Sequence, residues 1–324
     1  MKFFPVFLCC LLLAGCASGS VPVSAATPTL PETLPTETVP ADVPTDPESL
    51  SAAPAPVDPV RQMISDMSLE QRVGQLFLAR CNADTAAADI RQYHLGGLVL
   101  FGSDFENQTP DSMCQTIAAY QNSAEKPLLI AVDEEGGDVT RISQFPAFRD
   151  RRFSSLRKRY DQGGLEGVLA EEEEKCRLLS DLGINVNLGP VCDITTEPEA
   201  FMYSRSLGQD AQTTAEVTAS TVNLMNAFSI GSVLKHFPGY GNNADTHIGI
   251  AVDTRALSEL EEQDLVPYTA GIPAGCGAVM VGHIVVEALD AEFPASLSPA
   301  VHRYLRDNLE FTGVIMTDDL VMQA

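Results

Sequence analysis

The chain has few basic residues: 20 Lys and Arg stand against 44 Asp and Glu, which gives a formal net charge of −24. Nucleic acids attract proteins through positively charged surfaces, so this balance excludes a nucleic-acid partner. Molecules with so much charge of one sign repel their own copies. We therefore expect a soluble monomer.

Cysteines are few in the part of the chain that is expected to fold. Three of the eight lie within the first 16 residues, and the other five are widely spaced: Cys81, Cys114, Cys176, Cys192 and Cys276. Their spacing matches no metal-ligand motif, and an odd number argues against a dense disulfide framework. We expect most of them to be buried thiols, and the sequence indicates neither a metal site nor a cofactor.

The apolar run at the start of the chain, MKFFPVFLCCLLLAGC, is too short for a membrane-spanning helix. Lys2 precedes the run and small residues end it, which is the pattern of a secretory signal. The ending Leu13-Ala14-Gly15-Cys16 resembles a bacterial lipobox, in which Cys16 becomes the lipidated first residue. An ordinary cleaved signal with a nearby cysteine is the alternative. We expect residues 1–16 to be a lipoprotein signal and the mature protein to be anchored to the outer side of a cell membrane.

Residues 17–58 contain no aromatic residue, Lys or Arg, whereas proline recurs every few positions among Thr, Ser, Ala and Glu. Such a segment cannot bury enough apolar surface to offset the entropy lost on ordering. It is expected to be a disordered tether between the anchor and a folded domain at residues 59–324.

Short apolar runs alternate with amphipathic stretches in residues 59–324, which predicts a parallel sheet covered by helices on both faces. The clearest expected helices are Leu165–Leu182, closed by Gly183, and Leu257–Thr269, and Ser68 to Gln71 form a candidate capping box. Seven strands are expected, at Leu76–Ala79, Leu98–Phe101, Leu128–Val132, Ile184–Val191, Ser232–Leu234, Ala278–Gly282 and Val314–Met316. A closed (β/α)8 barrel of the TIM type needs eight strands, so we expect this barrel to be incomplete at its C-terminus.

Ionisable residues recur where these expected strands end. In an α/β barrel the active site is built at the carboxyl ends of the strands. Such residues follow five of the seven runs: Asp133, Asp193, the pair Lys235-His236, His283 and the pair Asp318-Asp319. The repetition predicts a site at this end of the sheet, although an ion-pair network of purely structural importance is the alternative.

The stretch KHFPGYGNNADTH, from Lys235 to His247, combines titratable residues with helix and strand breakers. The expected strand delivers Lys235 and His236 to the barrel mouth, and Pro238, Gly239 and Gly241 then favour a loop over it. Asp245 and His247 are two residues apart, so in an extended backbone their side chains point the same way. A carboxylate beside an imidazole can orient it for proton transfer.

With these residues in view, the chain resembles glycoside hydrolase family 3, in its β-N-acetylglucosaminidase branch. The resemblance extends from about Ser68 to Ala324 and depends on segments in a fixed order rather than on any one of them. These segments are AVDEEGGDVTR, INVNLGPVCDI, RSLGQD, KHFPGYGNNADTH, PASLSP and GVIMTDDLVM.

The resemblance implies a retaining, two-step exo-hydrolysis of terminal β-linked N-acetylglucosamine, with peptidoglycan fragments as one source of substrate. Asp318 matches the nucleophile, and His247, held by Asp245, matches the acid/base, in place of the usual second carboxylate. Asp193 and His283 are given supporting roles. Matched sugar-binding positions are Asp133, Arg141, Arg205, Lys235 and His236.

Two positions depart from the family pattern, which usually has histidine at Tyr240 and arginine at Asp138. Tyr240 keeps a hydrogen-bonding ring, whereas Asp138 removes a positive charge and could shift specificity. Two other interpretations stay open. One is another family 3 glycosidase or a phosphorylase, and the other is a lipid-anchored sugar-binding protein without turnover, which would not require Asp318.

Overall fold

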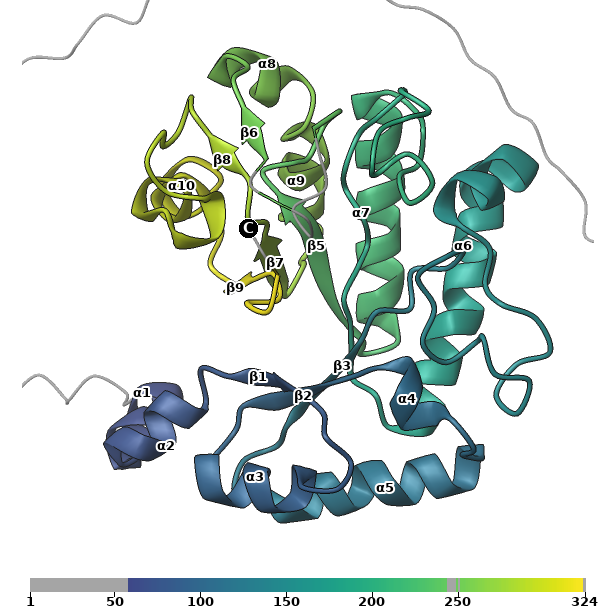
Figure 1. The fold of residues 1–324 in the computed structure, drawn as a ribbon, viewed down its shortest axis with the longest axis vertical. Coiled ribbons are helices and arrows are strands. Elements are labelled where there is room, and N and C mark those ends of the chain that lie inside the picture. The colour runs from purple at the N-terminus through teal and green to yellow at the C-terminus, as the bar shows by residue number, and fades with distance from the viewer. Residues whose placement is uncertain (1–57, 244–248, 250, 323–324) are drawn as a thin grey trace, which may run out of the picture. The chain divides into compact units, whose positions relative to one another are not determined.

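Seven strands form one parallel sheet in the computed structural model, which describes residues 58–243, 249 and 251–322. Their order across the sheet, β1-β2-β3-β4-β5-β7-β9, follows the chain. Figure 1 shows the sheet curling as it passes from β1 to β9, in the manner of part of a barrel. The strands are β1 (Leu78–Arg80), β2 (Gly97–Leu100), β3 (Leu129–Val132), β4 (Val186–Asn187), β5 (Gly231–Phe237), β7 (Ala278–Val281) and β9 (Val314–Thr317). The expected α/β fold with seven parallel strands of a TIM-type barrel is confirmed.

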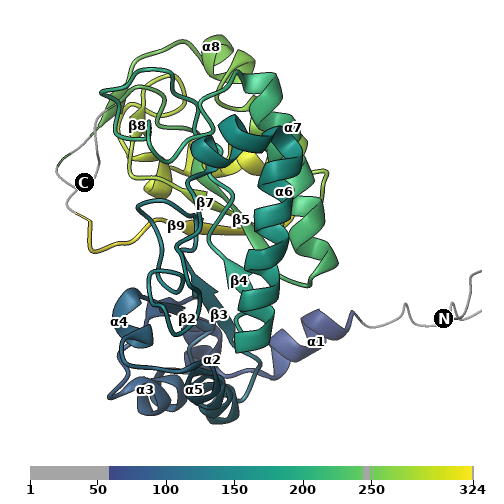
Figure 2. The same cartoon turned by 90° about the vertical axis from the view of Figure 1, so that its right-hand side faces the viewer.

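Helices connect the strands and cover the outside of the sheet (Figures 1 and 2). Helices α3 and α5 pack together, as do α6 and α7, and α7 also packs on α9. The α-helices are α1 (Pro59–Asp66), α2 (Leu69–Gly74), α3 (Ala86–Tyr93), α4 (Gly102–Phe105), α5 (Pro110–Ser123), α6 (Leu156–Leu182), α7 (Ala211–Ala227), α8 (Leu257–Glu262), α9 (Val266–Gly271) and α10 (Pro299–Arg303). A 3₁₀ turn, η1 (Ala295–Leu297), and a π-helical turn, η2 (Tyr304–Asn308), flank α10.

A second, two-stranded sheet pairs β6 (Val252–Asp253) with β8 (Val285–Val286). The sequence did not predict it, because runs of two residues carry no periodic signal. Among the residues described, none of the helices combines the length and apolar character needed to cross a bilayer.

Several local predictions are confirmed. Ser68 and Gln71 form both hydrogen bonds of a capping box at the start of α2. Gly183 ends α6 in the left-handed conformation, with φ at 84°. None of the five described cysteines is in a disulfide, and Cys176, Cys192 and Cys276 are buried.

Several elements differ from their predicted extents. Helix α6 begins at Leu156 rather than Leu165, because the helix continues across a non-helical residue at Gly164. The predicted helix Leu257–Thr269 is two helices, because the chain leaves helical geometry at Gln263 and restarts at α9, with Pro267 in its first turn. The predicted strand Ile184–Val191 is regular only at Val186–Asn187. Pro190 has no N–H to donate to a neighbouring strand, so the ladder is interrupted there.

The central strands are buried on both faces because alternate residues enter different apolar clusters, whereas the edge strands β1 and β9 are partly exposed. In β3, Ile130 and Val132 pack outward in the cluster beneath the helices, whereas Ala131 belongs to the inner cluster. Val233 of β5 and Met280 of β7 also belong to the inner cluster. A parallel sheet covered in this way requires continuous apolar strands, as the sequence has.

Candidate active site

Side chains along a strand point alternately inward and outward, and this alternation determines which strand-end residues share the inner face. Asp133 lies two residues beyond the inward Ala131, and Lys235 lies two beyond the inward Val233. Met316 of β9 packs against the same inner cluster, and Asp318 follows it by two residues. The backbone N–H of Asp318 donates to the Val281 carbonyl of β7 at 2.9 Å. These three side chains are therefore directed to one end of the curled sheet.

Lys235 joins the ends of β3 and β5. Its Nζ lies 2.6 Å from Asp133 Oδ1 and 2.6 Å from Glu135 Oε1, and only 2% of its side-chain surface is exposed. Burial alone would lower the pKa of Lys235, but the two carboxylates outweigh it, so the pKa lies above its ordinary value. Lys235 is thus a buried cation held between two anions.

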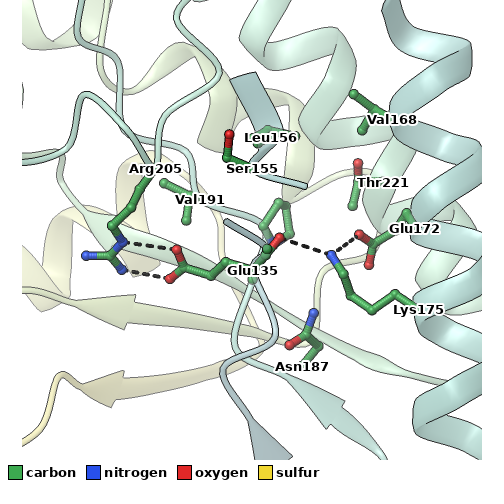
Figure 3. A pocket seen from close by; sticks show the side chains of 13 residues that line it. Glu135, Ser155, Leu156, Val168, Glu172, Lys175, Asn187, Val191, Arg205 and Thr221 are labelled. Carbon is green, nitrogen blue, oxygen red and sulfur yellow. Dashed lines mark hydrogen bonds and ion pairs between the residues drawn. The ribbon is translucent and has the colours of Figure 1, made fainter. Parts of the chain in front are cut away.

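Glu135 is also bound by Arg205, from the loop between β4 and α7. Nε and one terminal nitrogen of the guanidinium donate to the two carboxylate oxygens at 3.0 and 2.7 Å (Figure 3). Burial alone would raise the pKa of Glu135, but the charges of Lys235 and Arg205 hold it well below its usual range. Glu135 therefore remains ionised and fixes both cations.

His236 is oriented from two sides. Its Nδ1 lies 2.7 Å from Asp193 Oδ2, and its Nε2 lies 3.3 Å from a terminal nitrogen of Arg205. The other oxygen of Asp193 accepts the backbone N–H of Tyr240 at 2.8 Å. The Tyr240 ring is buried and meets the His236 ring edge to face, with centroids 5.3 Å apart. Asp193 therefore fixes both the imidazole and the start of the following loop.

Asp318 lies beside this group of charges. Burial alone would raise its pKa, but the charges of His236 and Lys235 and a hydrogen bond from the backbone N–H of Asp319 lower it. The carboxylate is therefore ionised at neutral pH. The neighbouring Asp319 is more exposed, and its carbonyl lies 3.1 Å from His283 Nε2.

Arg141 reaches the site from a turn built on a buried carboxylate. Glu134 accepts hydrogen bonds from the backbone N–H groups of Arg141, Ile142 and Ser143 and from the Ser143 hydroxyl. The Arg141 guanidinium lies 3.9 Å from Asp133 Oδ2, at the edge of ion-pair distance. Its interaction with Asp133 is thus looser than that of Lys235.

The structure brings together Asp133, Arg141, Arg205, Lys235 and His236, with Asp193 and Asp318 beside them. Asp245 and His247 lie outside the described residues. The unusual Asp138 is exposed in the loop after β3, and within the described ranges no cluster of three or more metal-ligating side chains is found.

Sequence reasoning missed Glu135 and Glu134, which organise the sugar-binding candidates without following a strand directly. The signal was present in Asp133-Glu134-Glu135, where three acids precede Gly136 and Gly137. Both glycines have positive φ, at 109° and 62°. The chain therefore turns sharply after β3, which brings Glu135 back over the sheet.

The fold is that of a glycoside hydrolase. A family model described as "Glycosyl hydrolase family 3 N terminal domain" matches residues 68–324. The chain therefore belongs to glycosyl hydrolase family 3.

Relatives with similar sequences carry the name beta-hexosaminidase. The one from Stenotrophomonas maltophilia (strain R551-3) is 37% identical over 239 residues, which are 71% of this chain and 69% of the relative. The one from Xanthomonas campestris pv. campestris (strain B100) is 35% identical over 240 residues, covering 71% of this chain and 70% of the relative.

Solved structures have the same fold. A family 3 beta-N-acetylglucosaminidase from Paenibacillus sp. str. FPU-7 matches with a TM-score of 0.72 and 30% identity, over 79% of this chain and half of that one. NagZ from Neisseria gonorrhoeae, in complex with N-trifluoroacetyl-D-glucosamine, matches with a TM-score of 0.66 and 28% identity, over 76% of this chain and 74% of that one.

Proposed function

We propose that the protein hydrolyses terminal β-linked N-acetylglucosamine from glycans and retains the anomeric configuration. One observation carries the proposal: Asp318 lies beside a preorganised set of hydrogen-bonding side chains at the carboxyl ends of the strands. Such groups suit the hydroxyls and the amide of an amino sugar. The names of the relatives support the choice of sugar.

In the proposed first step, Asp318 attacks the anomeric carbon and the bond to the departing oxygen breaks. His247, oriented by Asp245, gives that oxygen a proton. In the second step, His247 removes a proton from water, which attacks the same carbon and releases Asp318. The lowered pKa of Asp318 supports its role, since it arrives at the reaction already ionised.

Lys235, Arg205 and His236 are proposed to bind the sugar hydroxyls. Each is already held by a carboxylate in the absence of sugar, through Asp133, Glu135 or Asp193. Groups ordered in advance lose little entropy when a ligand binds. Asp133 and Arg141 complete the proposed set.

We further propose that the enzyme works outside the cytoplasmic membrane, anchored by lipid at Cys16, and that peptidoglycan fragments are its natural substrates. The lipobox and the Pro/Thr-rich tether support this location. Terminal N-acetylglucosamine of cell-wall fragments is within reach of an enzyme placed there.

The test is the hydrolysis of an aryl β-N-acetylglucosaminide by the full-length protein, without phosphate. NMR spectroscopy of the first product formed should show the β-anomer of N-acetylglucosamine. An initial α-anomer would contradict retention, and turnover that requires phosphate would show a phosphorylase. Binding of N-acetylglucosamine without any turnover would show that the protein binds sugar and is not an enzyme.

A further inference from the structure

A buried ion pair lies on helix α6, behind the residues that the proposed function assigns to sugar binding. Lys175 Nζ is 2.7 Å from Glu172 Oε2, and the two side chains are 8% and 9% exposed. Burial alone would lower the pKa of Lys175, but Glu172 outweighs it and the pKa is raised. The lysine is therefore charged in the interior of the domain.

The second contact of this lysine leads to the active site. Lys175 Nζ donates to the backbone carbonyl of Glu135 at 3.3 Å, and the Glu135 side chain binds Arg205 (Figure 3). The same side chain also binds Lys235. Figure 3 shows the resulting series of contacts, from Glu172 through Lys175 and Glu135 to Arg205. A helix on the outside of the sheet is thus connected to two proposed sugar-binding cations.

Packing alone does not hold Glu135 from this side. A cavity of about 40 Å³ lies between Glu135 and residues of α6 and α7, and its walls include Lys175, Glu172 and Thr221. A side chain that borders a cavity loses the contacts that close packing would supply. The Lys175 hydrogen bond links α6 to the Glu135 carbonyl, and the Glu135 N–H donates to the Val139 carbonyl within its own loop.

The energetic cost of the pair supports a role beyond folding. Two charges lose their hydration when buried, and replacing such a pair by apolar side chains is often neutral or stabilising. The arrangement is therefore poorly explained as a device for stability. A purely apolar contact could not donate to the Glu135 carbonyl.

We propose that Lys175, ionised and oriented by Glu172, is a positioning residue for the sugar site. It fixes the backbone at Glu135, and Glu135 in turn fixes Arg205 and Lys235 for the sugar hydroxyls. The inference rests on the proposed function, because it takes N-acetylglucosamine as the ligand. Lys175 itself does not touch the substrate.

The main test is the double variant Glu172→Leu/Lys175→Met in the full-length protein, which removes both charges and leaves neither unpaired. Its melting temperature should equal or exceed that of the wild type. Its Kd for N-acetylglucosamine, measured by calorimetry, should rise about tenfold, the equivalent of one hydrogen bond to a charged group. KM for an aryl N-acetylglucosaminide should rise with it, and kcat should change less.

Two further variants separate positioning from general damage. Lys175→Arg keeps a charged donor and should retain most of the affinity. Lys158→Met removes an exposed lysine from the same helix and is the matched control, with no expected change in Kd.

A folded double variant with wild-type Kd and KM would overturn the proposal. If the double variant does not fold, Lys175→Gln decides, because its shorter neutral side chain cannot hold Glu135 in the same way. Wild-type binding by Lys175→Gln, or failure of both variants to fold, would show that the pair maintains the domain only. An inactive wild type would instead contradict the proposed function, so the two failures are distinguishable.

Discussion

Glu135 Oε1 lies 2.6 Å from Lys235 Nζ, although the two residues come from the loop after β3 and the end of β5. The same carboxylate binds Arg205 through two hydrogen bonds. One buried anion therefore sets the distance between two cations that are proposed to bind sugar. Glu135 thereby connects the stability of the site with its proposed function.

Replacing Glu135 by Gln should destabilise the domain by about 3 kcal/mol, because it leaves Arg205 without its anion and Lys235 with Asp133 alone. The loss should depend on pH. The pKa of Glu135 is depressed in the folded state, so its stabilising effect is complete above the unfolded pKa, near pH 4.5. It declines as the pH falls towards the folded pKa, because only the unfolded chain binds a proton in that window.

Urea unfolding of the wild type and Glu135→Gln at pH 7 and at successively lower pH would measure this difference. Glu166→Gln, at an exposed position of α6, is the control and should have no such effect. A difference in the free energy of unfolding that is the same from pH 7 to pH 3 would contradict an ionised, depressed Glu135.

Asp318→Ala should abolish turnover of every substrate, however good the leaving group, because the covalent bond cannot form. We expect kcat to fall by about 10⁴-fold or more. The variant at the adjacent residue, Asp319→Ala, should have a much smaller decrease in kcat. Steady-state kinetics with an activated aryl N-acetylglucosaminide would distinguish them, and the opposite order would make Asp319 the nucleophile.

His247→Ala should affect the two chemical steps differently. A good leaving group departs without a proton, so the first step should tolerate the change, whereas the second still needs water to be deprotonated. The glycosyl-enzyme should then accumulate, giving a pre-steady-state burst with an activated substrate and faster turnover with azide. If the variant lost the same activity on activated and unactivated substrates, with no burst and no rescue by azide, His247 would not be the acid/base and would only bind sugar.

Gly136→Ala should destabilise the domain and weaken N-acetylglucosamine binding. The φ of Gly136 is 109°, and an added Cβ would lie 2.1 Å from the Ser154 carbonyl oxygen. Moving that backbone would displace the adjacent Glu135, and we expect a loss of about 2 kcal/mol or more. Gly163→Ala, with open space around its Cβ, is the control and should be neutral or slightly stabilising. Thermal unfolding that is equal in the two variants would refute this account.

Cys16→Ser should release the protein from membranes if Cys16 carries a lipid. Lipid chains supply the apolar contact that holds such a protein at a bilayer. Fractionation of cells that produce the wild type and the variant is the measurement. Equal partitioning of both into the membrane fraction would show that the lipobox interpretation is wrong.

The sequence by itself determined the parallel α/β architecture, because its apolar runs are continuous and alternate with amphipathic stretches. It also indicated the end of the sheet where the candidate site lies, since Asp133, Lys235 and Asp318 each follow such a run. Local sequence patterns were sufficient to predict the capping box at Ser68 and the end of a helix at Gly183. These features depend on neighbouring residues, which the sequence displays directly.

Only the tertiary structure decided which of these charges meet and through which partner. The central position of Glu135 follows from a turn at Gly136 and from the approach of Arg205 and Lys235, which come from distant parts of the chain. No local pattern encodes that approach. The buried Lys175 looks in the sequence like one more charge on an amphipathic helix, and its burial and its contact with Glu135 exist only because α6 packs against the sheet.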